Sequence, residues 1–309
     1  MKRIGNLYEK IISLDNLRLA DEKARRGKLR SYGVLLHDKN REANILALHE
    51  TLKNHTFKNS EYSTFTIYEP KERIIFRLPY YPDRILHHAI MNILEPIWVS
   101  VFTKDTYSCI KGRGIHGAMR NVKRAIKDRE NARYCLKIDI RKFYPSIDHD
   151  VLKTIIRRKI KCKDTLALLD TIIDSTDGVP IGNYLSQYFA NLMLAYFDHW
   201  IKEEKRVRYY FRYADDMVFL ASTKEELHIL LADIKKYLAA LKLTLKGNEQ
   251  IFPIAENRAD KHGRGLDFVG FVFYHNQTLM RKSIKQNFCR MAARLNKKLN
   301  ISARDYKQK

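Results

Sequence analysis

Two acidic segments carry the residue types best suited to chemistry in this 309-residue chain. Asp215 and Asp216 lie between two apolar runs, and Asp139 ends a third apolar run that begins at Leu136. Carboxylates gathered at strand ends can hold two divalent cations about 3.5–4 Å apart, the arrangement used for in-line attack on a phosphate. Because such oxygen ligands suit Mg²⁺, the three acids predict magnesium-assisted phosphoryl transfer.

A turn also explains these aspartates without any function, because Asp is a favoured residue in hairpin turns. Asp215 and Asp216, however, are adjacent like charges at the edge of an apolar hairpin. Such a pair repels unless a cation or a basic group neutralises it. Asp139 adds a third acid in a comparable strand, which favours the functional interpretation.

The charge of the chain predicts a polyanionic partner. Lysine and arginine total 58 against 35 acidic residues, giving a net charge of +23 and a pI of about 9.8. A basic excess of this size favours nucleic acid, bound through counterion release.

The four cysteines form no C-x-x-C pair, so we expect reduced thiols. With no long apolar run and no signal-like N-terminus, we expect a cytoplasmic protein without a membrane contact.

The elements that must position the acids alternate between helices and strands. Apolar spacing and end signals predict helices over residues 6–26, 39–54, 83–100 (capped by Asp83), 115–128, 184–204, 224–241 and 283–299, and others from Asp148 and Thr165. Alternation predicts a basic hairpin over 63–78 with its turn at 70–72, strands at 133–141, 207–213 and 216–221, and strand-like pieces near 250–254 and 267–274. Helices interleaved with an antiparallel sheet predict an α+β fold.

These segments together resemble a known family. Tyr213–Asp216 resembles the Y-x-D-D box of reverse transcriptases, and Asp139–Tyr144 resembles their first palm motif, an Asp with an aromatic residue five positions on. Residues 266–271 resemble the primer grip, and residues 73–84 resemble the fingers of group II intron-like enzymes. The resemblance implies a right-hand polymerase fold with an antiparallel palm sheet.

The same resemblance implies how the chain divides. It implies an N-terminal basic helical extension over residues 1–60 and fingers over 61–135, joined by helices from 150–200. The palm would span 136–275, and a short thumb would span 276–309. Since the segment after residue 275 is too short for a ribonuclease H domain, we expect other factors to remove the RNA and integrate the cDNA.

The resemblance also assigns roles at the site. Asp139, Asp215 and the Ile140 carbonyl would hold two Mg²⁺ ions, for which Mn²⁺ can substitute, with Asp216 in support. Tyr144 would lie under the sugar of the incoming dNTP and clash with a 2′-hydroxyl, the group that distinguishes the two substrate classes. An ordinary core position is the alternative, because Phe143 and Tyr144 are adjacent and one of them must pack.

Basic residues supply the remaining predicted contacts. Arg73 and Arg77 would grip the triphosphate bidentately, with solvated surface charge as the alternative. Lys246 is a candidate to protonate the leaving pyrophosphate, unless Glu249 takes that position. Four further residues are expected to bind the phosphate backbone of nucleic acid: Arg84, Lys282, Lys285 and Arg290.

One motif departs from its usual form in reverse transcriptases and indicates a particular subgroup of the family. Most reverse transcriptases carry Gln before the Gly of the next motif and Ser-Pro at its end, whereas this chain has Ile181 before Gly182 and Ser186-Gln187 at the end. This form resembles the reverse transcriptases of diversity-generating retroelements, which copy a template RNA into cDNA with frequent errors at template adenines. Ile181 cannot donate the hydrogen bonds of a glutamine, although plain packing also explains it. We expect Ile181, Gly182 and Gln187 to contact the incoming nucleotide.

The resemblance implies template RNA, primer or cDNA, dNTPs and a small, basic, oligomeric accessory variability protein as partners. A retron or defence-associated reverse transcriptase is the alternative enzyme, since it shares the metal boxes. A catalytically dead polymerase fold that only binds nucleic acid is the alternative outside catalysis. That last interpretation requires the loss of the carboxylates, yet all three acids are present.

Overall fold

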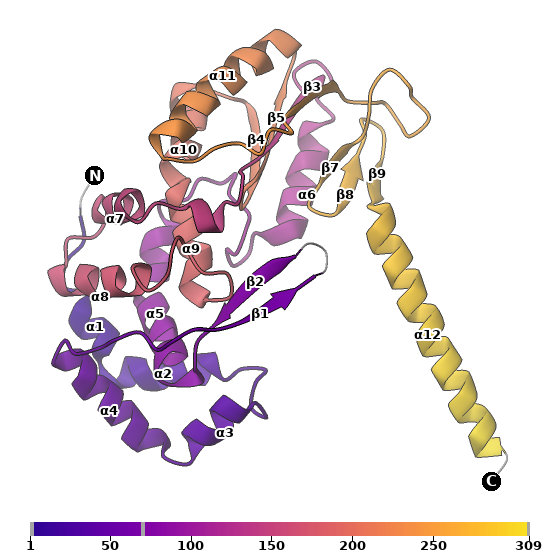
Figure 1. The fold of residues 1–309 in the computed structure, drawn as a ribbon. Helices are drawn as coiled ribbons and strands as arrows, with labels where there is room; N and C mark the ends of the chain where they lie inside the picture. Colours follow the sequence, from indigo (N-terminus) through magenta and orange to yellow (C-terminus); the bar gives the residue numbers. More distant parts are fainter. Residues whose placement is uncertain (1–2, 69–71, 308–309) are drawn as a thin grey trace.

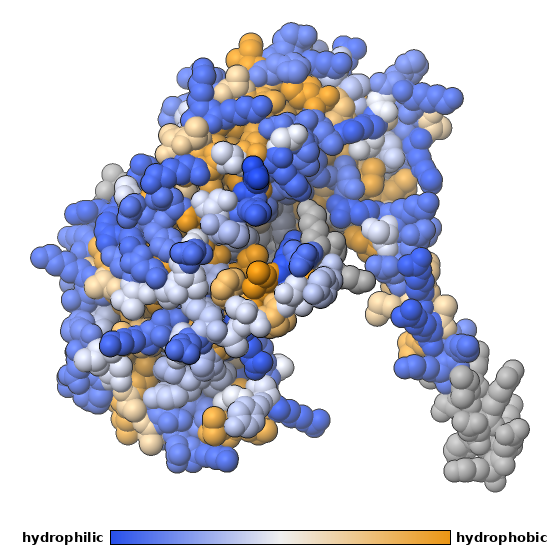
Figure 2. Space-filling model, viewed as in Figure 1, coloured by the Kyte–Doolittle hydropathy of each residue, from blue (hydrophilic) through white to orange (hydrophobic). Residues whose placement is uncertain are grey.

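The computed structural model describes residues 3–68 and 72–307. Helices of the first hundred residues gather at one end, and the four-stranded sheet lies toward the other end (Figure 1). A β-hairpin extends from the N-terminal helices toward the space faced by the long C-terminal helix, which projects from the body (Figure 1). The arrangement leaves an open channel between the body and this helix (Figure 2).

The N-terminal region forms four helices where the sequence predicts two. They are α1 (Tyr8–Ile12), α2 (Leu14–Ala24), α3 (Tyr32–Asp38) and α4 (Arg41–Lys53). The prediction of one helix over 6–26 is wrong because Ser13 leaves the helical region (φ −54°, ψ 141°), and its side chain accepts from the Asn16 backbone N–H. Such serine caps start a new helix.

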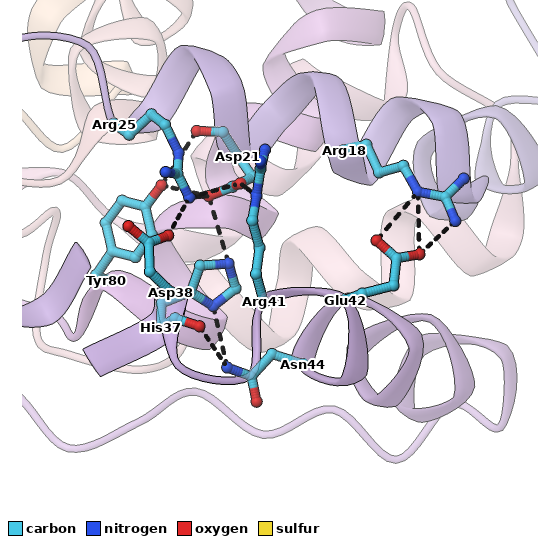
Figure 3. A network of polar contacts seen from close by, with 9 residues as sticks. All are labelled: Arg18, Asp21, Arg25, His37, Asp38, Arg41, Glu42, Asn44 and Tyr80. Carbon is cyan, nitrogen blue, oxygen red and sulfur yellow. Dashed lines mark hydrogen bonds and ion pairs between the residues drawn. The ribbon is translucent and has the colours of Figure 1, made fainter. Parts of the chain in front are cut away.

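A buried carboxylate ties these helices to the segment that follows the hairpin. Asp21 on α2 has no exposed surface and accepts hydrogen bonds from Arg25, Arg41 and Tyr80 (Figure 3). Tyr80 belongs to an irregular turn, Tyr80–Arg84, that leads into α5 (Ile85–Val99). A buried charge is tolerated only when it is paired and hydrogen-bonded, so this network fixes how the N-terminal helices lie against that turn.

The predicted basic hairpin is present. β1 (Ser63–Ile67) pairs antiparallel with β2 (Arg73–Arg77), while the predicted turn residues Pro70 and Lys71 lie outside the described residues. Asp83 does not cap α5, because Arg84 takes the cap position. Asp83 is buried, and its Oδ1 accepts from the Ser60 backbone N–H at 3.0 Å.

The central sheet has the strand order β4-β5-β3-β6. Its strands are β3 (Tyr134–Asp139), β4 (Tyr209–Tyr213), β5 (Asp216–Ala221) and β6 (Gln250–Pro253), all paired antiparallel. Successive residues of β3 alternate between two hydrophobic clusters, with Leu136 in one and Cys135 in the other. Because both faces of the sheet are covered, its inner strands are apolar almost throughout.

Helices cover the sheet and connect its strands: α6 (Gly114–Ala125), α7 (His149–Arg157), α8 (Lys163–Ile173), α9 (Tyr184–Met193), α10 (Ala195–His199) and α11 (Lys224–Ala240). The helix predicted from Asp148 is α7, and the Asp148 side chain caps it by accepting from the Val151 N–H. The single helix predicted over 184–204 is instead interrupted at Leu194 (φ −105°, ψ 1°) and ends in an irregular turn, Trp200–Glu204.

The C-terminal part forms a small sheet and one long helix. β7 (Leu266–Phe268), β8 (Phe271–Phe273) and β9 (Thr278–Met280) pair antiparallel, and α12 spans Lys282–Lys307. The strand-like piece predicted at 267–274 is a hairpin, because Val269 (φ 45°) and Gly270 (φ 87°) reverse the chain. The cysteines are free, as expected, and the described residues include no helix long and apolar enough to cross a membrane.

Candidate active site

The three predicted carboxylates meet at one edge of the central sheet. Asp139 is the last residue of β3 and lies opposite Asp216, the first residue of β5. Asp215 lies beside them in the two-residue turn between β4 and β5, after Ala214. Ala214 has a φ of 55°, which costs a non-glycine residue roughly 1–2 kcal/mol. The surrounding structure must therefore stabilise this turn.

Burial and nearby negative charge raise the pKa values of Asp215 and Asp216. Burial raises the pKa of Asp215 to about 7, and the hydrogen bond and charge of Asp139 act in the same direction. Burial raises the pKa of Asp216 to about 6, opposed by Lys137 and reinforced by Asp139. The Asp216 Oδ1 atom is buried without a hydrogen-bond partner among the described residues. A carboxylate cluster of this kind gains stability from an added cation.

Two lysines lie against the acids. Lys246 Nζ is 3.3 Å from Asp139 Oδ2, and the Lys246 backbone N–H donates to the Asp139 carbonyl at 2.9 Å. Lys137 Nζ is 3.5 Å from Asp216 Oδ2 and donates to the carbonyl of Asp267 at 2.5 Å. Glu249, the alternative to Lys246, lies instead beside Lys235 on α11 at 3.6 Å.

The donor set fits Mg²⁺ bound partly by substrate. Among the residues that the structure describes, histidine, cysteine and acidic side chains form no group of three that could already hold a metal ion. Mg²⁺ characteristically uses one or two carboxylates and completes its shell with water and substrate phosphates. Asp139 and Asp215, which lie close enough for Asp139 to raise the pKa of Asp215, supply such a pair. Ile140, whose carbonyl is the predicted third ligand, is buried and bridges to Leu245.

Tyr144 lies toward the acids, whereas its neighbour packs in the core. Phe143 is 2% exposed, and Tyr144 is half-buried at the start of a short turn. Burial raises the pKa of Tyr144 to about 12, with Cys109 and Asp215 adding to the shift and Arg73 opposing it. The Tyr144 carbonyl accepts from the Val179 N–H at 2.9 Å, which joins this turn to the segment containing Ile181.

The Ile181 segment is fastened to the β1–β2 hairpin. The Ile181 carbonyl accepts from the Phe76 N–H at 2.7 Å. Gly182 has a φ of 122°, and a Cβ there would lie 2.4 Å from the Phe76 carbonyl oxygen, so glycine permits this approach. The Ile181 side chain is half-buried. Gln187 is exposed and lines a cleft of about 350 Å³ together with His88 and Tyr184.

The structure separates the predicted basic residues. The charge of Arg73 lowers the pKa of Tyr144 and so opposes the effect of burial. Arg77 lies about 13 Å farther along the strand, where its charge helps to lower the pKa values of Arg84 and Lys28. Burial lowers the pKa of Arg84, and the charge of Arg77 adds to this. The buried Arg84 Nε has no hydrogen-bond partner among the described residues. The predicted thumb residues Lys282, Lys285 and Arg290 are exposed on α12, which begins directly after Arg281, the ion-pair partner of Asp267.

Sequence reasoning missed Lys137 as a partner of the acids, since it pairs with Asp216. A signal existed for Lys137, which is a charged residue inside an apolar strand, two positions before Asp139. Alternation places residues i and i+2 on the same face of a strand, so the sequence places Lys137 on the same face of β3 as Asp139, although it does not reveal which acid Lys137 pairs with.

Comparison with known proteins identifies the family. Residues 64–248 match the family described as reverse transcriptase (RNA-dependent DNA polymerase). The match covers more than half of the chain, so the chain belongs to this family of RNA-dependent DNA polymerases.

The relatives are distant. Protein YkfC of Escherichia coli (strain K12) is 24% identical over 266 residues, covering 70% of this chain and 67% of that protein. The group II intron-encoded protein LtrA of Lactococcus lactis subsp. cremoris is 27% identical over 139 residues, covering 41% of this chain and 23% of LtrA. Relatedness to group II intron-encoded proteins, predicted from the fingers segment, is therefore confirmed at the family level.

The fold is similar to that of telomerase. Apo telomerase from Candida tropicalis, truncated from its C-terminal domain, superposes with a TM-score of 0.52 at 13% identity, covering 75% of this chain and 58% of that chain. This chain thus spans less than two thirds of the telomerase and less than a quarter of LtrA. The likeness confirms the predicted α+β right-hand polymerase fold. The division into extension, fingers, palm and thumb stays a prediction.

Proposed function

We propose that this chain is an RNA-directed DNA polymerase that extends a primer by two-metal nucleotidyl transfer. The observation that carries the proposal is the meeting of Asp139, Asp215 and Asp216 at one sheet edge, in a chain of the reverse transcriptase family. The raised pKa values of Asp215 and Asp216 support a site that gains stability from bound cations.

Two Mg²⁺ ions, or Mn²⁺ in their place, would activate the primer 3′-hydroxyl and stabilise the charge of the triphosphate. Asp139, Asp215 and the Ile140 carbonyl would hold them, with Asp216 in support. Lys137 pairs with Asp216 and so limits the negative charge of the site. Lys246 holds an ammonium group beside Asp139, where it would donate a proton to the leaving pyrophosphate. Arg73 would bind the triphosphate bidentately.

A primer-extension assay tests the reaction. On a defined RNA template with dNTPs and Mg²⁺, wild-type protein should extend the primer, and Asp215→Ala should reduce the rate by several orders of magnitude. Asp233→Ala is the matched control, because it removes an aspartate from α11 that is paired with Lys205. Equal extension by wild type and Asp215→Ala would contradict the role of Asp215, and no extension by wild type would favour a fold that only binds nucleic acid.

We further propose that the enzyme is error-prone at template adenines and serves targeted gene diversification by mutagenic retrohoming. The supporting observation is Ile181, an apolar residue where most reverse transcriptases carry glutamine. Sites that discriminate by hydrogen bonds lose much selectivity when those bonds are absent. Template RNA, dNTPs and a small, basic, oligomeric accessory variability protein are the partners that this role requires.

Sequencing of the cDNA tests this assignment. Ile181→Gln should lower the error frequency at template adenines more than at other template bases, because glutamine restores polar groups beside the base pair. Ile181→Leu is the control, since it preserves the apolar character and should preserve the error spectrum. An unchanged spectrum in Ile181→Gln would contradict the role in fidelity and leave a retron or defence-associated enzyme as the better interpretation.

A further inference from the structure

A buried ion pair lies directly behind the catalytic turn. Arg212 on β4 and Asp198 on α10 both have no exposed surface. Arg212 Nε donates to Asp198 Oδ1 at 2.8 Å, and Arg212 Nη2 donates to Asp198 Oδ2 at 2.6 Å. Two-point pairing of this kind fixes the orientation of the guanidinium plane as well as its position.

The pair is fully satisfied by its neighbours. Asp198 also accepts from the Tyr210 hydroxyl at 2.7 Å and the Thr106 hydroxyl at 2.8 Å. The remaining donors of Arg212 reach the side chain and carbonyl of Asn191, and its Nη1 also donates to the Ala214 carbonyl at 3.1 Å. All five N–H groups of the guanidinium therefore have acceptors within reach.

The backbone of Arg212 is held independently of its side chain. Its N–H donates to the Asp105 carbonyl at 2.9 Å, and its carbonyl accepts from the Tyr107 N–H at 3.0 Å. These two backbone hydrogen bonds hold β4 on the edge that faces away from β5. The side chain extends from this anchor to the Ala214 carbonyl, two residues on, and so connects the core of the molecule with the turn itself.

Ala214 is the residue of the turn that most needs support, because it adopts a φ of 55° without being glycine. Its carbonyl belongs to the peptide that leads into Asp215, so the orientation of that peptide sets the direction of the Asp215 carboxylate. Strained backbone of this kind persists only where its surroundings over-determine it.

We propose that Arg212, held by Asp198, is a positioning residue that fixes the Ala214 peptide and thereby orients Asp215 for metal binding. The inference rests on the proposed function of Asp215 as a metal ligand. A purely structural pair would stabilise the fold without affecting the metal affinity of the turn, and this difference makes the two roles separable.

The decisive variant removes both buried charges together, Arg212→Met with Asp198→Leu, because a buried ion pair exchanged for apolar residues commonly leaves a fold stable. Arg212→Lys is the second variant, which keeps the charge but loses the planar fork. Arg41→Met is the matched control, since it withdraws an arginine from buried Asp21 among the N-terminal helices (Figure 3).

Mn²⁺ affinity without nucleotide, measured by electron paramagnetic resonance, is the primary readout, and steady-state primer extension is the second. We expect the double variant to bind Mn²⁺ several-fold more weakly and to lose about 10- to 100-fold in kcat, with the KM for dNTP nearly unchanged. Arg212→Lys should show a smaller loss of the same kind. Arg41→Met should lower the melting temperature while keeping the wild-type Mn²⁺ affinity and kcat.

Wild-type Mn²⁺ affinity in the folded double variant would overturn the inference. If the double variant does not fold, wild-type affinity in Arg212→Lys would overturn it, and weakened affinity would support it. The proposed function fails differently, because then wild type itself would not extend a primer or Asp215→Ala would match it. Mn²⁺ binding is measured without polymerisation, so the effect of Arg212 on metal affinity can be tested whether or not the protein extends a primer.

Discussion

At the scale of single residues, two adjacent aromatic rings, Phe143 and Tyr144, lie in different environments. Phe143 is buried in the main core, while Tyr144, 5.7 Å away between ring centroids, lies at the acids. Tyr144 also packs against this core with part of its surface, and we propose that its ring selects the sugar of the incoming nucleotide. The role of Tyr144 in substrate selection therefore stays a prediction.

Replacing Tyr144 with alanine should admit ribonucleotides, because the ring that would clash with a 2′-hydroxyl is gone. We expect the ratio of kcat/KM for dNTP over rNTP to fall by about 100-fold, in line with losses of steric discrimination at small groups. Competitive primer extension measures the ratio. Tyr144→Phe should preserve it, because the ring remains, and unchanged discrimination in Tyr144→Ala would refute the assignment.

The acids could be predicted from sequence, but their electrostatic state could not. Motif spacing identified Asp139, Asp215 and Asp216, since strand ends of one sheet converge. The pairing of Asp216 with Lys137 and of Asp139 with Lys246 depends on side-chain reach between strands, and so do the raised pKa values. The buried Arg212–Asp198 pair likewise joins elements whose contact no local pattern encodes.

At the scale of elements, one junction connects the hairpin with the site. Gly182 lies where the segment before α9 meets β2, and its missing Cβ lets the Phe76 N–H bond to the Ile181 carbonyl. The same segment holds Tyr144 through the Val179 N–H. A displacement of the hairpin would therefore reach both Arg73 and Tyr144.

Gly182→Ala should loosen this junction, because the added Cβ would meet a backbone oxygen at 2.4 Å and the φ of 122° is unfavourable for alanine. We expect a destabilisation of about 1–3 kcal/mol and a raised KM for dNTP, measured by chemical denaturation and primer extension. Gly27→Ala is the control, since Gly27 also has a positive φ (69°) but faces open space. A KM unchanged from wild type would contradict this role of the junction.

Element types were predictable where hydrophobic periodicity is strong, as in the basic hairpin, α11 and the strands that flank the acidic turn. Interruptions were not, because they depend on single residues. Ser13 divides the first predicted helix, Leu194 divides α9 from α10, and Val269-Gly270 divides β7 from β8. The apolar periodicity continues on both sides of each interruption, so periodicity alone does not reveal where the element is interrupted.

At the scale of the whole molecule, stability depends on a histidine buried without a charge partner among the described residues. His87 on α5 is 2% exposed, and its Nε2 has no hydrogen-bond partner in the same part of the chain. Burial lowers its pKa from 6.5 to about 3, with His88 and Arg84 adding to the shift. The unfolded chain therefore takes up a proton as the pH falls through 6.5, while the folded chain does not until about pH 3.

The contribution of His87 to stability is thus complete above pH 6.5 and is lost as the pH falls toward the folded pKa. At about pH 5 the loss should reach roughly 2 kcal/mol. His87→Leu should flatten the fall in unfolding free energy between pH 7 and pH 5, as measured by urea denaturation. His228→Leu, at an exposed position of α11, should keep the wild-type slope. Identical slopes for both variants would disprove the role of His87.

The net charge of +23 acts over the channel between the body and α12 (Figure 2). If Lys282, Lys285 and Arg290 bind the phosphates of the primer–template, their joint replacement by glutamine should weaken binding and reduce its salt dependence. The slope of log K against log salt should fall by about 0.7–0.9 for each phosphate that the variant no longer neutralises, as measured by fluorescence anisotropy at several salt concentrations. The matched control replaces Lys224, Lys235 and Lys236 of α11 and removes the same charge elsewhere. An equal change of slope in both triple variants would indicate that net charge alone, and not the thumb helix, governs binding.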